Sequence, residues 1–247
     1  MKKLVYYILF FVVLISVIFY QYELPQMSFT NFEYAHRGHF SEDIPENSLM
    51  SIEEAIALKK GIEIDIRLSK DQYPMVFHDN RLDRMTNQEG FFGAYNKNEL
   101  ELFQLDDSKE NIPSLAEALT LVDGKVPLIL DLKGDLLSKT LENKVLKALK
   151  DYKGTVYLQS ANPMTNRYLS EKSDYKIGYI TISVLPIGDV VFQKFQAYLA
   201  DSISEFDYVA LNGKYFQTDE LKTLDNHLIW FVNKNRMIRP QKNDNSI

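Results

Sequence analysis

The feature that most constrains the fold is a regular alternation of short apolar runs with longer amphipathic segments. Such apolar runs are typical of buried strands, and apolar positions that recur every three or four residues are typical of helices. Strands and helices in alternation predict a parallel sheet, because each parallel crossover needs a helix-sized connection. The expected strands lie at residues 32–37, 61–68, 73–77, 126–132, 155–159, 175–180, 206–211 and 227–232. The expected helices lie at residues 49–60, 97–103, 113–122, 141–152, 163–171, 190–199 and 219–225.

About eight strands in a chain of 247 residues favour an α/β fold of the (β/α)8 or TIM-barrel type, with an open doubly wound sheet as the alternative. One connection departs from a regular barrel, because the link from Leu68 to Pro74 is too short for a helical crossover. We therefore expect the barrel to be distorted around residues 66–112, or the second apolar run to be a hairpin arm at the barrel mouth. Residues 80–112 fit a long insertion.

The N-terminal segment predicts a membrane anchor, a transmembrane helix. Residues 4–20 carry no charge and follow two lysines. A helix of that length spans about 26 Å, which is marginal for a hydrocarbon core of about 30 Å. A cleaved signal peptide is the alternative, but no small-residue cleavage site follows the apolar run. The lysines favour a single-pass protein of the cell membrane with a cytoplasmic N-terminus and an extracytoplasmic barrel. The expected organisation is an anchor at 1–22, a linker at 23–31, a barrel at 32–233 and a basic tail at 234–247.

Composition excludes some classes of function and leaves the oligomeric state open. The formal net charge of −6 argues against nucleic acid as the main partner. The chain has no cysteine, which excludes disulfides and thiolate chemistry. It also has no glycine-rich loop of the P-loop or dinucleotide-binding type.

The stretch from Gly61 to Asp79 carries the first candidate functional group. Glu63 and Asp65 are two positions apart in an expected strand, so their side chains point the same way. If the two apolar runs pair around a turn near Asp71, His78 comes level with these carboxylates. An imidazole beside paired carboxylates indicates metal-assisted acid–base chemistry, and the alternative is a polar strand edge with scattered charges.

Two further strand ends carry polar residues. His36 and Arg37 end the first expected strand, and Asp131 and Lys133 end the most apolar one. Because active sites of barrels lie where the strands end, we expect these residues and the Gly61–Asp79 stretch at one rim. Three carboxylates suit a hard cation such as Ca²⁺ or Mg²⁺ better than zinc, which usually takes nitrogen or sulfur ligands. Arg37, Lys133 and a cation together can hold a phosphate, and histidines on both sides can exchange protons.

The ordered motifs of the chain resemble those of the glycerophosphodiester phosphodiesterase family. The resemblance is close over about residues 34–133 and weaker toward the C-terminus. The family is a (β/α)8 barrel, which agrees with the architecture inferred from the alternation. The motifs are HRG at 36–38, PENS at 45–48, EID at 63–65, KDQYPMVFHD at 70–79, LDRMT at 82–86, IPSLAEAL at 112–119, LDLK at 130–133, QSANP at 159–163 and IWFVN at 229–233.

The resemblance implies hydrolysis of a glycerophosphodiester to glycerol phosphate and an alcohol, with one divalent cation, Ca²⁺ or Mg²⁺. In this family a substrate hydroxyl near the phosphorus can attack first and give a cyclic phosphate, which water then opens. The resemblance assigns His36 and His78 as the general acid–base pair, Glu63, Asp65 and Asp131 as metal ligands, Arg37 and Lys133 as substrate-binding residues, and Glu46 and Asn47 as supporting residues.

The chain departs from the family pattern at two positions and at its short C-terminal end. Asp131 stands where the family usually has glutamate, which puts the metal affinity and the choice of metal in question. Ala161 stands where an aromatic residue is usual, and this opens the expected substrate pocket. Three other functions remain: a lysophospholipase D-type enzyme acting on lipid headgroups, a glycerol-phosphate-polymer phosphodiesterase, and a non-catalytic barrel that binds phosphodiesters.

Overall fold

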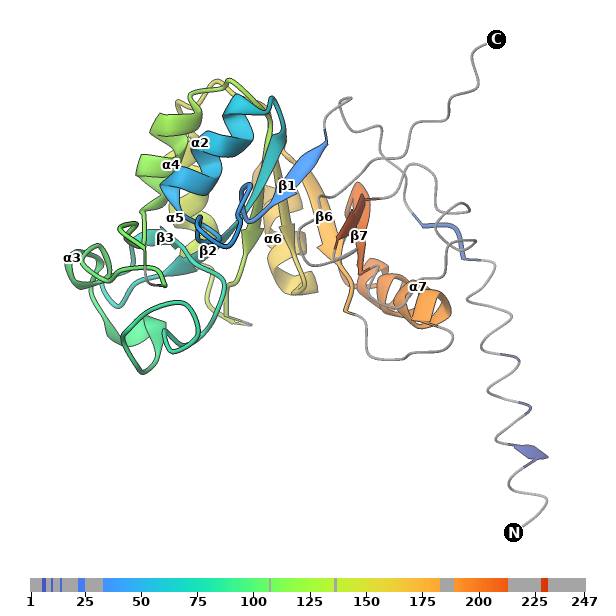
Figure 1. Ribbon diagram of the computed structural model, residues 1–247. Helices are drawn as coiled ribbons and strands as arrows, with labels where there is room; N and C mark the ends of the chain where they lie inside the picture. The colour runs from blue at the N-terminus through green and yellow to red at the C-terminus, as the bar shows by residue number, and fades with distance from the viewer. Residues whose placement is uncertain are drawn as a thin grey trace.

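The computed structural model of the chain describes residues 6–7, 10, 14, 22–24, 33–106, 108–135, 137–182, 189–212 and 228–230. One curved sheet runs through these residues, and helices cover its outer side (Figure 1). The strands are β1 Tyr34–His36, β2 Gly61–Leu68, β3 Pro74–Val76, β4 Leu128–Leu132, β5 Val156–Ser160, β6 Lys176–Ile180, β7 Tyr208–Asn212 and β8 Leu228–Trp230. The helices are α2 Leu49–Ala57, the 3-10 helix η1 Phe92–Ala94, α3 Lys97–Leu100, α4 Leu115–Val122, α5 Thr140–Leu149, α6 Pro163–Lys172 and α7 Asp189–Asp201.

Seven strands are parallel neighbours in the order β1-β2-β4-β5-β6-β7-β8. A curved parallel sheet covered by helices is the wall expected of a (β/α)8 barrel. Within the described residues no pairing joins β8 to β1, so this part of the sheet is a curved wall and not a closed ring. The expectation of eight barrel strands counted the run at residues 73–77, and the structure instead places β3 beside this path.

The β2–β3 connection is a hairpin, which confirms the hairpin-arm alternative. β3 is antiparallel to β2, with Ile66 opposite Val76. The N–H of Phe77 then donates to the carbonyl of Asp65 over 2.9 Å, which extends the pairing by one residue. His78 therefore lies beside the carboxylate-bearing part of β2, as the sequence predicted.

Residues 80–112 form an insertion with a hydrophobic core of its own, separate from the main core. The rings of Phe77 and Phe92 stack with their centres 4.9 Å apart. Val76 belongs to the main core, whereas the residues on either side of it, Met75 and Phe77, belong to the insertion core. The hairpin arm thus joins the two cores. The buried members of the insertion core are Met75, Phe77, Leu82, Met85, Phe92, Leu100, Leu105 and Ile112.

The two faces of the main sheet differ in content because side chains alternate along each strand. On the outer face, Ile64 of β2 and Leu130 of β4 are fully buried in the main core with the helices. Each such side chain contributes about 1.5–3 kcal/mol to folding by burial. The inner face instead carries Glu63, Asp65 and Asp131, and a second cluster that includes three tyrosines. The sheet therefore combines an apolar outer face with a polar interior.

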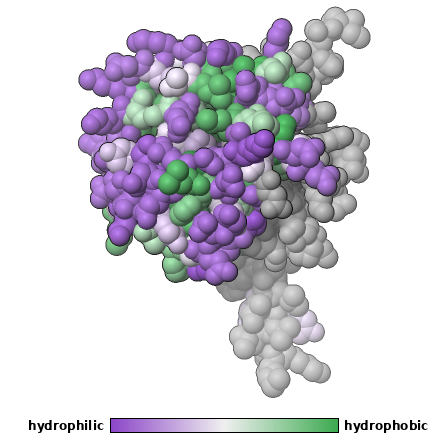
Figure 2. Space-filling view, turned by 60° about the vertical axis from the view of Figure 1, so that its left-hand side comes forward, coloured by the Kyte–Doolittle hydropathy of each residue, from purple (hydrophilic) through white to green (hydrophobic). Residues whose placement is uncertain are grey.

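The outside of the molecule is mostly hydrophilic on the side shown in Figure 2, with small hydrophobic areas between. The expected anchor at residues 4–20 lies largely outside the described residues, as do the expected helix at 219–225 and the tail at 234–247. Across the parts of the chain that are described, no helix has both the length and the apolar character needed to cross a bilayer.

Candidate active site

Three buried carboxylates from neighbouring strands meet on the inner face of the sheet. Glu63 and Asp65 come from β2, Asp131 comes from β4, and none is more than 4% exposed. Asp65 lies directly opposite Asp131 in the parallel register. One carboxylate oxygen of each residue lies within 4.8 Å of the other two. The predicted shared face of Glu63 and Asp65, and their predicted meeting with Asp131 where the strands end, are therefore confirmed.

The donor set of this cluster fits a hard divalent cation. Within the described residues, Asp131 Oδ1 is buried and has no hydrogen-bond partner. A buried carboxylate oxygen needs a donor or a cation to offset the loss of water, and carboxylate oxygens are the ligands that Ca²⁺ and Mg²⁺ prefer. Glu63, Asp65 and Asp131 together can hold such an ion.

The electrostatics of the cluster also favour a bound cation. Burial, together with the nearby Asp65 and Asp131, raises the pKa of Glu63 well above its usual value. Burial acts in the same direction on Asp65, but Lys133 and Arg37 outweigh it and hold the pKa of Asp65 below its usual value. Burial raises the pKa of Asp131. A divalent cation would stabilise the charged form of all three carboxylates.

Lys133 is the ammonium closest to this cluster. Its Nζ donates a hydrogen bond to Asp131 and lies 3.1 Å from Asp65 Oδ1. Burial alone would lower the pKa of Lys133, but the two carboxylates outweigh burial and raise it. The side chain is therefore a fixed positive charge at the end of β4.

The chain reverses sharply after β1, and this turn positions Arg37. Arg37 has a φ of 57° and Gly38 a φ of 75°. A Cβ on Gly38 would lie 2.2 Å from Ser51 Oγ, so both the φ and the close packing against α2 require glycine. The N–H of Arg37 donates to Glu63 Oε2 over 2.9 Å, and its guanidinium Nε lies 3.4 Å from Asp65 Oδ2. The left-handed backbone conformation of Arg37, beside buried carboxylates, is a local strain of the kind that occurs at functional sites.

Glu46 and Asn47 hold this turn from the loop before α2. Glu46 Oε1 accepts a hydrogen bond from Arg37 Nη1 over 2.8 Å. Asn47 Nδ2 donates to Asp65 Oδ2 over 2.9 Å, and Asn47 Oδ1 accepts from the N–H of Asp65 over 3.1 Å. Asn47 also has a left-handed backbone, with a φ of 58°, and its N–H donates to the carbonyl of Arg37. Both residues therefore support the site by fixing the groups that face the cavity.

His36 is the last residue of β1 and His78 follows β3, and the two histidines differ in their surroundings. The side chain of His36 is 17% exposed, and its Nε2 lies 3.8 Å from Glu63 Oε2. Burial and then Arg37 lower the pKa of His36 from 6.5 to about 3, so its ring is neutral near pH 7. His78 Nδ1 lies 2.5 Å from Asp79 Oδ1. Asp79 in turn accepts from Arg84 Nε over 2.6 Å, so this carboxylate is held between the two side chains.

One small cavity, of about 40 Å³, is lined by seven of the nine residues expected at the site. Glu46 and Asn47 lie behind them through the contacts described above. Sequence reasoning missed Gln159, which also lines the cavity, and the clamp formed by Asp79 and Arg84. Gln159 and Arg84 both lie within the quoted motifs QSANP and LDRMT, which could have indicated them. The seven lining residues are His36, Arg37, Glu63, Asp65, His78, Asp131 and Lys133.

Comparison with known sequences matches the chain to one family of phosphodiesterases. The sequence model described as "Glycerophosphoryl diester phosphodiesterase family" matches residues 36–235. A glycerophosphodiester phosphodiesterase of Caldanaerobacter subterraneus subsp. tengcongensis is 34% identical over 158 residues, which are 59% of this chain and 65% of that protein. Glycerophosphodiester phosphodiesterase 1 of Mus musculus is 35% identical over 121 residues, which are 44% of this chain and 36% of that protein. The chain thus spans less than two thirds of the length of these relatives.

Comparison with solved structures supports the same fold. A phosphodiesterase of Oleispira antarctica in complex with the product sn-glycerol-3-phosphate has a TM-score of 0.64 at 24% identity, over 85% of this chain and 86% of that one. At this identity the likeness concerns the fold, and it agrees with the curved parallel sheet described above.

Proposed function

Since the chain belongs to the glycerophosphoryl diester phosphodiesterase family, we propose that it hydrolyses glycerophosphodiesters to glycerol phosphate and an alcohol. The observation that supports this best is the meeting of three buried carboxylates, two histidines and two cationic side chains on one cavity. Random polar residues at strand ends do not gather in this way. The arrangement contains the groups that phosphoryl transfer needs: a cation site, charge stabilisers for the phosphate, and proton donors and acceptors on different elements.

In this proposal Glu63, Asp65 and Asp131 hold one divalent cation. When bound, such an ion neutralises the negative charge of the phosphodiester and of the transition state. Whether the ion is Ca²⁺ or Mg²⁺ is a question for the add-back experiment below. Asp131 reaches less far than a glutamate would. This favours Ca²⁺, whose larger and more flexible coordination tolerates a withdrawn ligand better than the strict octahedral coordination of Mg²⁺.

Arg37 and Lys133 orient the phosphodiester. The guanidinium of Arg37 offers planar, paired donors, and Lys133 offers a compact positive charge. Both are held by carboxylates on one side, Glu46 for Arg37 and Asp131 for Lys133. Held in advance, they can stabilise charge on the phosphoryl oxygens without reorganising during the reaction.

His36 and His78 exchange the protons. Because burial keeps the ring of His36 neutral, His36 is the proposed base that takes the proton from the attacking oxygen. Asp79 binds Nδ1 of His78, which fixes the ring and leaves Nε2 as the nitrogen that gives a proton to the leaving alcohol. The attacking oxygen, of a substrate hydroxyl or of water, bonds to phosphorus as it gives its proton to His36, and the bond from phosphorus to the alcohol breaks as the leaving oxygen takes the proton of His78. Arg84 secures Asp79 and so positions His78 indirectly.

A direct test measures glycerol 3-phosphate released from a panel of glycerophosphodiesters by the purified protein. We expect release that stops with EDTA and returns when one of Ca²⁺ or Mg²⁺ is added back. Release that is unaffected by EDTA would contradict the metal-dependent reaction. Metal binding by calorimetry without turnover of any diester would instead favour the non-catalytic binder.

We also propose that residues 4–20 anchor the protein in the cell membrane with the barrel outside. This rests on the uncharged run and the lysines before it. The test is fractionation of cells followed by protease treatment of intact spheroplasts. Recovery of the full-length chain in the soluble fraction would contradict the anchor, and protection of the barrel from protease would contradict its orientation.

A further inference from the structure

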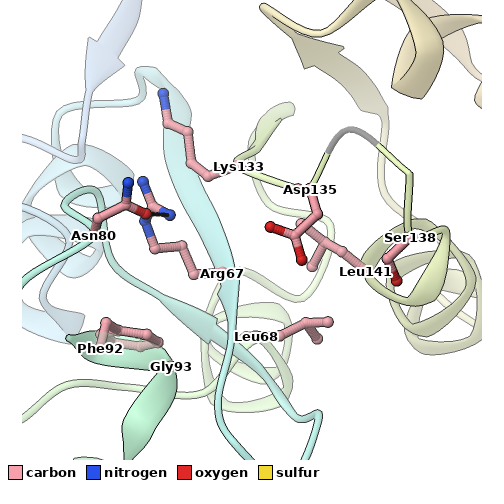
Figure 3. A pocket seen from close by; sticks show the side chains of 10 residues that line it. Arg67, Leu68, Asn80, Phe92, Gly93, Lys133, Asp135, Ser138 and Leu141 are labelled. Atoms are coloured by element: carbon pink, nitrogen blue, oxygen red, sulfur yellow. Dashed lines mark hydrogen bonds between the residues drawn. The ribbon is translucent and has the colours of Figure 1, made fainter.

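A second hollow lies beside the catalytic cavity, at the ends of β2 and β4 and against the insertion (Figure 3). Its volume is about 160 Å³, compared with about 40 Å³ for the catalytic cavity. Lys133 lines both spaces, so they adjoin at that side chain. We call this hollow the side pocket. The residues of its lining that matter here are Arg67, Asn80, Phe92, Lys133, Asp135 and Leu141.

Arg67 forms one wall of the side pocket. It follows Glu63 and Asp65 at every second position of β2, so its side chain lies on the same face as theirs. Its Nε donates to the carbonyl of His78 over 2.7 Å, and its Nη1 donates to Asn80 Oδ1 over 2.5 Å. These two bonds fix the plane of the guanidinium. No hydrogen bond of Nη2 to any described residue is found, which leaves donors for a ligand.

Asp135 forms the opposite wall. It lies in the loop after β4, beyond Asp131 and Lys133 and therefore farther from the carboxylate cluster. Its side chain is exposed, and no described residue donates a hydrogen bond to its carboxylate. Figure 3 shows the carboxylate oxygens turned toward the side of the pocket where Arg67 and Asn80 lie. Leu141 and Phe92 add apolar surface between the two charged walls.

The charges of the side pocket therefore follow a fixed order, with cations next to the catalytic cavity and a carboxylate beyond them. A phosphodiester whose alcohol carries an ammonium group has the complementary order, an anion and then a cation a few atoms away. We propose that the side pocket receives the alcohol part of the substrate and selects a small alcohol with a primary ammonium group, such as ethanolamine. This inference rests on the proposed phosphodiesterase function and names its substrate class.

The lining of the side pocket favours a primary ammonium over the competing alcohols. By the measure in which one water molecule takes about 10–15 Å³, a space of about 160 Å³ has room for an alcohol of a few heavy atoms. A neutral polyol can donate hydrogen bonds to Asp135 but offers its carboxylate no positive charge. A quaternary ammonium is held best by several aromatic faces, and among the described residues Phe92 is the one aromatic side chain of this lining.

The test compares kcat/KM for glycerophosphoethanolamine, glycerophosphoglycerol and glycerophosphocholine in the metal-loaded full-length protein. We expect the ethanolamine diester to be preferred, and Asp135→Asn to lower its kcat/KM relative to the glycerol diester by up to about fivefold, the upper end of the range for an exposed ion pair. Asp151→Asn is the matched control, because Asp151 is exposed beyond the end of α5 and does not line the side pocket. Thermal unfolding of both variants checks that they fold.

Two kinetic results would overturn the proposal: equal use of the three diesters by the wild type, or an equal loss on all of them in Asp135→Asn. The second result would mean that the side pocket holds the glycerol part that all three share. If no diester is hydrolysed, the proposed function fails and binding decides the side pocket separately. Calorimetry should then show that phosphoethanolamine binds the wild type several-fold more tightly than Asp135→Asn, whereas equal binding would refute the assignment.

Discussion

The two halves of the curved sheet present different chemistry at the same level. Asp65 and Asp131, on β2 and β4, lie in register with Gln159, Gly178 and Tyr208 on β5, β6 and β7. The first half, called the charged half, therefore supplies carboxylates. The second half, called the neutral half, supplies the amide of Gln159, a glycine without a side chain at Gly178, and the phenol of Tyr208. Charges interact more strongly where neutral side chains exclude water. In the proposed reaction the charged half supplies the reacting groups, and the neutral half keeps water away from them.

The largest test of this division is the loss of a proton-transfer group from the charged half. His78→Ala should lower kcat by about 10²- to 10⁴-fold, because general acid–base catalysis contributes that much. His39→Ala is the control, since His39 lies in the loop after β1 and does not line the cavity. The measurement is steady-state release of glycerol 3-phosphate. Turnover by His78→Ala within a few-fold of the wild type would remove His78 from the reaction.

The next test concerns Asp131, a proposed metal ligand at a position where the resemblance predicts glutamate. Asp131→Asn removes one negative charge from the cluster and should weaken divalent-cation binding by about 10- to 100-fold. Asp131→Glu keeps the charge and should retain most of the affinity. Tyr208→Phe, in the neutral half, should change the affinity little. Isothermal titration with Ca²⁺ and Mg²⁺ measures all three, and unchanged binding by Asp131→Asn would place the ion elsewhere.

A third test examines the packing of the neutral half. A Cβ on Gly178 would lie 2.2 Å from Tyr208 Cζ, so Gly178→Ala must displace the ring that reaches Gln159. We expect a loss of about 1–3 kcal/mol in the free energy of unfolding, as for other overpacked interiors. Gly93→Ala is the control, because its added Cβ meets nothing within 4 Å. Urea denaturation gives both values, and equal stability of the two variants would contradict the close packing over β6.

The smallest expected effect is the change in the free energy of unfolding for each unit of pH. Below about pH 6.5 the unfolded chain protonates His36, whereas the folded protein keeps it neutral down to about pH 3. The unfolded state then binds more protons, so stability falls as the pH drops through this window, by at most about 1.4 kcal/mol per pH unit. In EDTA, the difference in unfolding free energy between wild type and His36→Gln should shrink from pH 7 to pH 5. The corresponding difference for Tyr208→Phe should stay constant, and a constant difference for His36→Gln would contradict the buried neutral ring.

Much of the charged half could be predicted from the sequence because its arrangement depends on residues that are close together along the chain. Glu63 and Asp65 share a face by strand alternation alone, and the short link after Leu68 indicated the hairpin that brings His78 beside them. The neutral half could not be predicted in this way. The closeness of Tyr208 to Gln159 depends on the register of three strands and on the missing side chain at Gly178. The clamp of Arg84 on Asp79 and Glu46 joins residues from two loops, and its geometry depends on the folded insertion.

The hairpin arm that joins the two cores has a consequence for local unfolding. Val76 packs into the main core, while Met75 and Phe77 pack into the insertion core, one residue before His78. Partial unfolding of either core would free this arm and separate His78 from His36, even with every other residue in place. Hydrogen exchange at the Phe77 amide, which donates to the carbonyl of Asp65, would therefore report local unfolding of this arm. The approach of the two histidines therefore depends on the folding of both cores.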